Sequence, residues 1–206
     1  MKRQLILISG LFLCIACYAQ KFQYGITSHI AINQPQKYRT HIGWAIGFIG
    51  EYNFNQNKIG NFYFTSKLKF SEKGWKDDIY DIEEEKHTRT THTYYLEIPI
   101  SIGYKLIINT KSNIFFDFGP YLAYGLFGNY NIDYAELEND KKDLFTCGAY
   151  KRFDFGCQGN IGINITNFQI GIGAVQSIIK PTKDIWNLEN PKEKSFLLNI
   201  SYFFNR

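Results

Sequence analysis

Tyr94 to Gly128 read YYLEIPISIGYKLIINTKSNIFFDFGPYLAYGLFG, a stretch with the pattern of two long β-strands joined by a short polar turn. Bulky apolar residues take alternate positions in each half, and small, polar or isolated charged residues take the positions between them. Because side chains of a strand point alternately to opposite faces, each strand has one apolar face and one small or polar face. This combination is typical of a narrow closed barrel whose outside contacts lipid.

The same alternation recurs along the chain and predicts eight strands in all. They are expected at Phe22–Asn33, Ile42–Phe54, Phe62–Trp75, the two halves of Tyr94–Gly128, Arg152–Ile165, Phe168–Ile179 and Phe196–Phe204. Most exceed the ~9 to 11 residues that a tilted strand needs to cross a bilayer. The mean hydropathy of -0.27 is compatible with this, because alternating strands average apolar and polar residues together. We therefore predict an all-β fold, an eight-stranded antiparallel up-and-down transmembrane β-barrel.

The connections between these strands alternate in length. Three are short and turn-like: Asn55–Gly60, Asn109–Asn113 and Thr166–Asn167. Four are longer and charged: Asn33–His41, Lys76–Thr91, Asn129–Lys151 and Lys180–Lys194. Outer-membrane barrels have short periplasmic turns and longer external loops, so the order predicts that both mature termini are periplasmic.

The first 19 residues have the pattern of a signal peptide. Lys2 and Arg3 precede an apolar run, and Cys17 to Ala19 provide a small-residue cleavage site. We expect residues 20–206 to form the barrel domain in the cell outer membrane. Without Lys2 and Arg3 the 23 basic residues fall to 21, against 19 acidic residues, and this balance argues against nucleic-acid binding. A lipoprotein anchor at Cys17 is the competing interpretation.

Cleavage would leave Cys147 and Cys157 in the mature chain. An exported protein meets an oxidising compartment, so a disulfide is chemically possible. Ten residues of extended chain span roughly 33 Å, however, and we expect two inert thiols instead. The sequence shows no metal-ligand spacing, and we predict no metal and no cofactor.

Aromatic residues cluster near the short connections. Those at the expected strand ends are Tyr24, Tyr52, Phe54, Phe62, Tyr104, Phe116, Phe168, Tyr202 and Phe204. Amphipathic rings favour the headgroup layer, and the pattern predicts an aromatic girdle at that interface. The simpler alternative is the general preference of aromatic residues for strands.

Several features together resemble the PorT-like outer-membrane β-barrel proteins of Bacteroidetes. They are the signal peptide, Tyr95-Leu96-Glu97-Ile98-Pro99, Gly119-Pro120-Tyr121, the glycine-rich region Phe155–Gly173 and the aromatic-ended last strand. The resemblance implies an eight-stranded barrel that the outer-membrane assembly machinery inserts, in a family whose members mostly lack an assigned activity. The chain departs from the usual terminal aromatic residue, since Asn205 and Arg206 follow Phe204.

Eight charged residues are expected on the inner face. They are Glu51, Lys67, Lys69, Glu97, Lys105, Asp117, Arg152 and Asp154. An eight-stranded barrel has an interior about wide enough for its own side chains, so these charges should pair. A hairpin symmetric about Lys111 places Lys105 opposite Asp117. We favour a structural network over a gated ion path.

Catalysis has little support in the sequence. His29, His41, His87 and His92 are the available bases, but no nucleophile elbow, HExxH or phosphate-binding glycine loop is present. An acidic run from Asp77 to Glu85 is ordinarily a solvated loop, although it could bind a divalent cation.

We therefore predict a non-enzymatic outer-membrane β-barrel protein with a filled polar lumen and charged extracellular loops, in an envelope-structural, adhesion or secretion-accessory role. Its expected partners are outer-membrane lipid, the assembly machinery during insertion and an extracellular or envelope protein that the loops contact. Two alternatives stay open: a soluble exported barrel that binds an apolar ligand, and a lipid-modifying outer-membrane barrel enzyme. Charged substitutions at Leu96, Ile98 and Ile172 should be harmless in the soluble barrel and costly in lipid.

Overall fold

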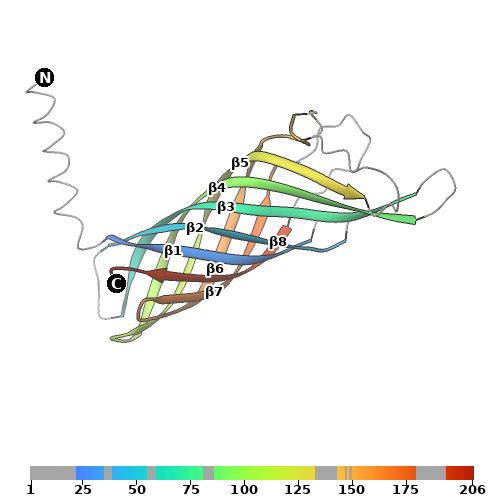
Figure 1. The fold of residues 1–206 in the computed structure, drawn as a ribbon. Helices are drawn as coiled ribbons and strands as arrows, with labels where there is room; N and C mark the ends of the chain where they lie inside the picture. The colour runs from blue at the N-terminus through green and yellow to red at the C-terminus, as the bar shows by residue number, and fades with distance from the viewer. Residues whose placement is uncertain are drawn as a thin grey trace, which may run out of the picture.

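The chain forms a closed ring of β-strands in the computed structural model, which describes residues 22–34, 39–54, 59–80, 86–132, 143–146, 148, 150–179 and 194–206 (Figure 1). The strands are β1 Phe22–Asn33, β2 His41–Asn53, β3 Gly60–Tyr80, β4 Lys86–Asn109, β5 Ser112–Ile132, β6 Phe153–Ile165, β7 Phe168–Ser177 and β8 Lys194–Phe203. Within those ranges no helix is long and apolar enough to span a membrane.

Each strand pairs antiparallel with the next, and β8 closes the ring by pairing with β1. Ile26 of β1, for example, lies between Phe48 of β2 and Tyr202 of β8. A closed ring leaves no sheet edge unpaired, as backbone surrounded by hydrocarbon requires. The predicted eight-stranded antiparallel barrel is confirmed.

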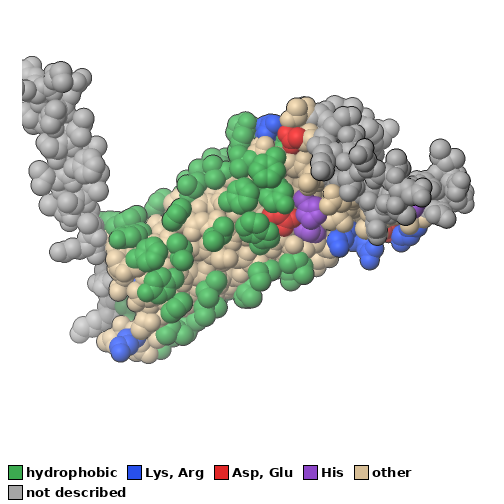
Figure 2. All heavy atoms as spheres, in the orientation of Figure 1, with side chains coloured by type: hydrophobic (Ala, Val, Ile, Leu, Met, Phe, Trp, Pro, Cys, Tyr) green, Lys and Arg blue, Asp and Glu red, His purple; other side chains and the backbone are tan. Residues whose placement is uncertain are grey.

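The distribution of side chains is the reverse of that in a soluble protein. Large apolar residues on all eight strands are exposed on the outside, and Figure 2 shows them as a broad belt across the visible face. Phe48, Ile102 and Phe118 are each more than 60% exposed. Glu51 is 0% exposed and lies with other charged groups in the lumen. This arrangement suits lipid outside and contradicts the soluble barrel with an apolar interior.

One end of the barrel carries the short turns, and we call it the short-turn end. Both ends of the described chain, at β1 and β8, lie there together with the turns after β4 and β6 (Figure 1). The predicted aromatic girdle surrounds this end. Its ring pairs, with centroids 4.9–6.0 Å apart, are Tyr24–Phe204, Tyr52–Phe54, Phe62–Tyr104, Tyr104–Phe116, Phe168–Tyr202 and Tyr202–Phe204.

The opposite end differs from the sequence prediction. Lys76–Thr91 was expected to be a loop, but β3 continues to Tyr80 and β4 begins at Lys86. The two strands stay in register up to the Tyr80–Lys86 pair, and past the end of β5, where Ile132 pairs with Arg89, they continue as a two-stranded ribbon (Figure 1). We call this projection the outer ribbon and this end of the barrel the ribbon end. Charged residues on both of its faces concealed the strand pattern.

A second correction concerns Phe127, which strict alternation with Tyr121 and Ala123 predicts on the inner face. The β4–β5 ladder shifts by one residue between Tyr94 and Tyr95, because Tyr94 pairs with Phe127 and Tyr95 pairs with Gly125. Such a bulge reverses the phase of the strand beyond it. Phe127 therefore points outward and stacks on Tyr94 with ring centroids 4.7 Å apart. Trp44 and Phe70 extend this row into a second aromatic cluster near the ribbon end.

Candidate functional site

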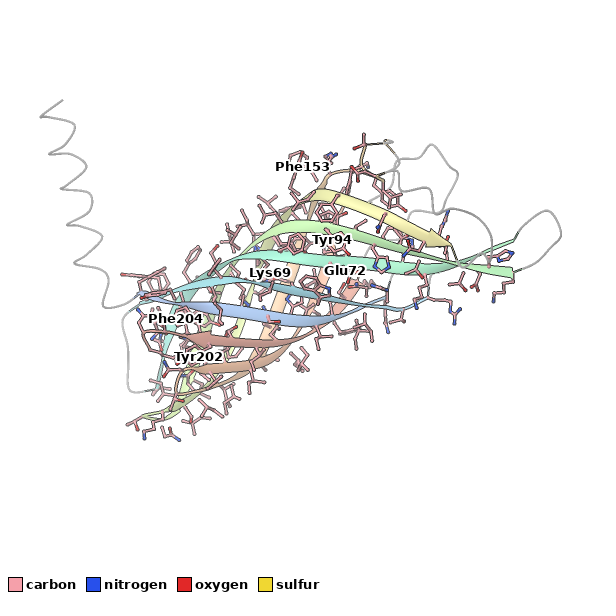
Figure 3. All side chains as sticks on the ribbon, in the orientation of Figure 1. Lys69, Glu72, Tyr94, Phe153, Tyr202 and Phe204 are labelled. Carbon is pink, nitrogen blue, oxygen red and sulfur yellow. The ribbon has the colours of Figure 1, made fainter. Side chains whose placement is uncertain are left out.

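The lumen holds most of the charged side chains expected there. The structure places seven of the eight inside, all buried: Glu51, Lys67, Lys69, Glu97, Lys105, Asp117 and Asp154. Strands β2 to β6 supply them from inward-facing positions, where every second residue points to the barrel axis. Figure 3 labels Lys69 within the barrel wall.

A first cluster lies near the short-turn end. The Lys105 ammonium bonds to Glu51 Oε1 and donates to Asn53 Oδ1 at 2.9 Å. Asn53 in turn donates to Glu51 Oε1 at 3.1 Å, and Asn61 donates to Asn53 Oδ1 at 2.9 Å. The expectation that Lys105 lies opposite Asp117 is wrong. The ladder places Phe115 opposite Lys105, because the strands shift register between Ile107 and Asn109 beside the turn.

Asp117 instead pairs with neutral groups. Tyr63 donates its hydroxyl to Asp117 Oδ2 at 3.0 Å, and Asn160 donates an amide hydrogen to Oδ1 at 2.7 Å. Asn199 extends the chain by donating to Asn160 Oδ1 at 3.1 Å. Lys67 is buried in the same part of the lumen, where Asp117 exerts an electrostatic attraction on it.

A second cluster lies nearer the ribbon end. Glu97 forms ion pairs with Lys69 and Lys73, with N···O distances of 2.9 and 3.0 Å. Lys73 also contacts Asp154 Oδ2 at 3.1 Å, and this oxygen accepts the Tyr121 hydroxyl at 2.9 Å. Lys73 therefore joins the two carboxylates. Lys73 is not among the eight predicted charges, although it lies in the same alternating phase as Lys67 and Lys69, and that alternation was the signal that could have identified it.

Arg152 is a correction to the predicted lumenal set. It precedes β6, and its guanidinium donates to the carbonyl oxygens of Gly125 and Leu126, both at 2.9 Å. The same group lies 3.5 Å from Asp143 and over the ring of Phe145, with 5.3 Å between Cζ and the ring centroid. Since β6 begins only at Phe153, Arg152 lies outside the strand alternation that predicted its direction. Its contacts link the segment with Asp143 and Phe145 to Gly125 and Leu126 of β5.

That loop segment closes the ribbon end of the lumen. Phe145 is 5% exposed and packs against Tyr95, Tyr121 and Ala123, all of them inward-facing. A Cβ atom on Gly125 would lie 2.4 Å from Phe145 Cζ, so this glycine makes room for the ring. Phe145 therefore acts as an apolar plug above the charged clusters.

The described lumen is close to neutral overall. The seven predicted residues together with Lys73 comprise four carboxylates and four ammonium groups. Such balance is needed because an unpaired buried charge is costly. A cavity of about 740 Å³ opens at the short-turn end, and Lys105, Asn53 and Asn61 of the first cluster line it together with Arg206. The lumen is thus a self-paired network between this cavity and the Phe145 plug.

The outer ribbon carries its own charges outside the apolar belt. Lys86 contacts Asp78 at 2.9 Å, Arg39 lies 3.6 Å from the same carboxylate, and Arg89 Nε donates to Asp77 at 3.1 Å. The hydrogen bond from Lys86, supported by the charge of Arg39, holds the pKa of Asp78 below its usual value. The ribbon therefore presents both signs of charge near neutral pH.

The histidines separate into different surroundings. His29 is buried in the lumen, and His87 lies on the outer ribbon at its pair with Ile79. His41 and His92 meet at the carboxylate of Glu72. Cys157 is a free, half-buried thiol on β6, and Cys147 lies outside the described residues, as do the predicted signal peptide and its cleavage site.

A closed ring of eight strands with an apolar outside and a filled, charged lumen defines the class of small outer-membrane β-barrels. Residues 18–180 match the family described as outer membrane protein beta-barrel domain, and the chain belongs to that family.

Solved structures with this architecture include the outer membrane enzyme PagL, with a TM-score of 0.50 and 9% identity over 86% of this chain and 98% of that one. The attachment invasion locus protein Ail of Yersinia pestis has a TM-score of 0.46 and 11% identity, with 89% of this chain and 97% of Ail covered. Neisserial surface protein A has a TM-score of 0.46 and 10% identity over 88% and 96% of the two chains. The likeness to PagL shows the fold alone. No curated protein matched the sequence.

Proposed function

We propose that this protein is a non-enzymatic outer-membrane barrel that acts through its outer ribbon and loops, in an adhesion, secretion-accessory or envelope-structural role. The observation that carries this proposal is the contrast between the lumen and the outer ribbon. Lumenal charges pair with one another under the Phe145 plug, whereas the ribbon projects charged side chains beyond the belt. A filled lumen contributes stability, and the exposed ribbon is the part that can meet a partner.

The chemistry of the ribbon favours a protein partner. Its paired strands carry Lys76, Asp77, Asp78, Lys86 and Arg89, a mixture of signs that suits complementary charges on a protein surface better than a polyanion. Outer-membrane lipid covers the apolar belt, and the assembly machinery of the outer membrane inserts the barrel. These partners belong to the same proposal.

We also place the protein within the PorT-like group of Bacteroidetes. The support is the sequence resemblance at Tyr95-Leu96-Glu97-Ile98-Pro99 and Gly119-Pro120-Tyr121. Tyr95, Glu97 and Tyr121 of these motifs belong to the lumenal packing around Lys73, which gives the motifs a structural reason.

The orientation is testable with single cysteines in a chain that carries Cys147→Ser and Cys157→Ser. Asp78→Cys reports on the outer ribbon, and Lys111→Cys reports on the turn at the short-turn end. A membrane-impermeant maleimide should label Asp78→Cys on intact cells and label Lys111→Cys only after the outer membrane is permeabilised. The reverse pattern would place the ribbon in the periplasm and contradict the proposal.

The partner is testable by site-specific photo-crosslinking on living cells. A photoreactive residue at position 78 should yield a discrete higher-mass adduct with a protein. The same residue at position 111, at the short-turn end, is the matched control. If Asp78 and Lys111 give the same adducts or neither gives one, the ribbon is not a protein-binding element.

A further inference from the structure

Three side chains from neighbouring strands meet on the outside of the barrel near the ribbon end. They are His41 at the start of β2, Glu72 in β3 and His92 in β4. Figure 2 shows histidine and acidic side chains together on the outer surface, where the apolar belt ends, and Figure 3 labels Glu72 at this place. The lumenal network does not include these residues.

Both histidines contact the same carboxylate oxygen of Glu72. Glu72 Oε1 lies 2.9 Å from His41 Nε2 and 3.0 Å from His92 Nδ1. The two imidazole rings meet edge to face, with centroids 5.1 Å apart. The three potential ligand atoms all lie within 4.8 Å of one another. They converge on one point from three strands, so the barrel wall itself holds them in place.

An irregularity between β2 and β3 produces this convergence. The β2–β3 ladder ends at the pair Trp44–Glu72, and an isolated bridge joins Arg39 to Lys76 further along. The step from Arg39 to Trp44 is five residues, whereas the step from Glu72 to Lys76 is four. One extra residue on the β2 side is a bulge, which redirects side chains. His41 thereby lies against β3 beside Glu72.

Gly74 provides the space for the His41 ring. A Cβ atom at Gly74 would lie 3.0 Å from His41 Cδ2 and 2.2 Å from the carbonyl oxygen of Thr91. A larger residue would displace the ring from the carboxylate. Glu72 itself is only 4% exposed and has Trp44 and Tyr94 as its cross-strand neighbours. A carboxylate in such surroundings requires a compensating positive charge.

We propose that His41, Glu72 and His92 bind a divalent transition-metal ion of the zinc class. Two imidazoles and one carboxylate form a donor set that zinc prefers, and a site with three protein ligands leaves a fourth position for water or another oxygen ligand. Ligand atoms about 2.0–2.2 Å from zinc lie roughly 3.4 Å apart in a tetrahedron. The present spacings, 2.9 and 3.0 Å to Glu72 and no more than 4.8 Å between any two of the three atoms, lie on both sides of that value.

A bound ion would join β2, β3 and β4 at the corner where the β2–β3 ladder ends. The carboxylate of Glu72 and two neutral imidazoles carry one negative charge, which a divalent cation overcompensates. The site then has a net positive charge at the outer boundary of the belt. Metal binding therefore both neutralises Glu72 and crosslinks three strands, consistent with the stabilisation that ligands give to the state they bind.

The test is zinc titration by calorimetry of the untagged, folded full-length protein in detergent, repeated with cobalt(II) to record the visible absorption of a tetrahedral site. Wild-type protein and the matched control His87→Ala should each bind one ion with equal affinity. His41→Ala and His92→Ala should each weaken binding at least tenfold and abolish the cobalt spectrum. Heat-modifiable gel mobility verifies that each variant is folded.

Glu72→Gln provides a second variant, which keeps the shape of the side chain and removes its charge. It should also weaken zinc binding at least tenfold while the barrel stays folded. Failure of the wild-type protein to bind zinc would overturn the proposal. Binding that is unchanged in folded His41→Ala and His92→Ala proteins would overturn it equally.

Discussion

Two glycines on opposite faces of the wall show how the consequences of a single methyl group depend on the direction in which it points. A Cβ atom on Gly103 would point into the lumen, 2.4 Å from the Phe116 carbonyl oxygen and 2.6 Å from Tyr63 Cζ. A Cβ atom on Gly159 would point outward, with its nearest neighbour, Phe118 Cδ2, at 3.5 Å. The lumen is tightly packed and the outer wall is not.

Gly103→Ala should therefore destabilise the barrel by about 1–3 kcal/mol, the usual cost of overpacking. Gly159→Ala is the matched control, and it should change stability little or raise it by up to about 1 kcal/mol through the unfolded chain. Urea unfolding from lipid vesicles measures both. If Gly103→Ala proves as stable as Gly159→Ala, the lumen has room for a methyl group near Tyr63.

Glu97 is the residue whose removal should disturb the lumen most. Glu97→Ala leaves Lys69 and Lys73 without the carboxylate that both contact, at 2.9 and 3.0 Å. Loss of one member of a buried ion pair typically costs about 3–5 kcal/mol. Arg39→Ala, which removes only an exposed pair with Asp78, should leave the unfolding midpoint unchanged. The same urea titration compares the two, and equal midpoints would contradict a paired lumen.

The lumenal positions were predictable from the sequence, but their partners were not. Alternation with period two determines which face a residue takes, and this placed Glu51, Glu97 and Asp154 correctly. Partner choice depends on register, which a turn can alter by one or two residues. The irregularity beside the turn moved Lys105 away from Asp117 and left it bound to Glu51.

At the scale of the strand, the alternating pattern is clear where the outer face meets lipid and is lost where both faces meet water. Within the belt, most outward positions are apolar, with Ser28 of β1 an exception, so β1 and β7 were visible as strands with their faces correct. Beyond the belt, water solvates both faces, and the outer ribbon shows no apolar alternation although its ladder continues. The His41–Glu72–His92 cluster was equally hidden, because it requires three strands in register and a bulge between two of them.

The depth of an outward residue in the belt should determine what a charge costs there. Ile172 is 61% exposed in the middle of β7, and Ile42 is 69% exposed at the start of β2 near the ribbon end. Ile172→Arg should cost about 2–4 kcal/mol, whereas Ile42→Arg should cost about 0–1 kcal/mol because it lies near the interface. Unfolding from vesicles measures the difference. Two small, equal costs would indicate that hydrocarbon does not cover β7.

For the molecule as a whole, closure and lumenal packing together determine what passes through it. Eight strands enclose a space about wide enough for side chains alone. Here four carboxylates and four ammonium groups occupy the described lumen, and Phe145 covers them at the ribbon end. An ion that entered would have to displace charges which already neutralise one another, so the network opposes conduction as well as stabilising the barrel.

The protein reconstituted in vesicles should therefore admit no small sugars, and it should show no stable conductance steps in planar bilayers. A large porin in the same lipid is the positive control for both measurements. Phe145→Ala removes the plug but leaves Lys73 bound to Glu97 and Asp154, so this variant should stay closed as well. Sugar uptake by the wild-type protein at the rate of the porin would show that the lumenal pairs separate readily. In that event the barrel itself, and not the outer ribbon, would be the functional part of the molecule.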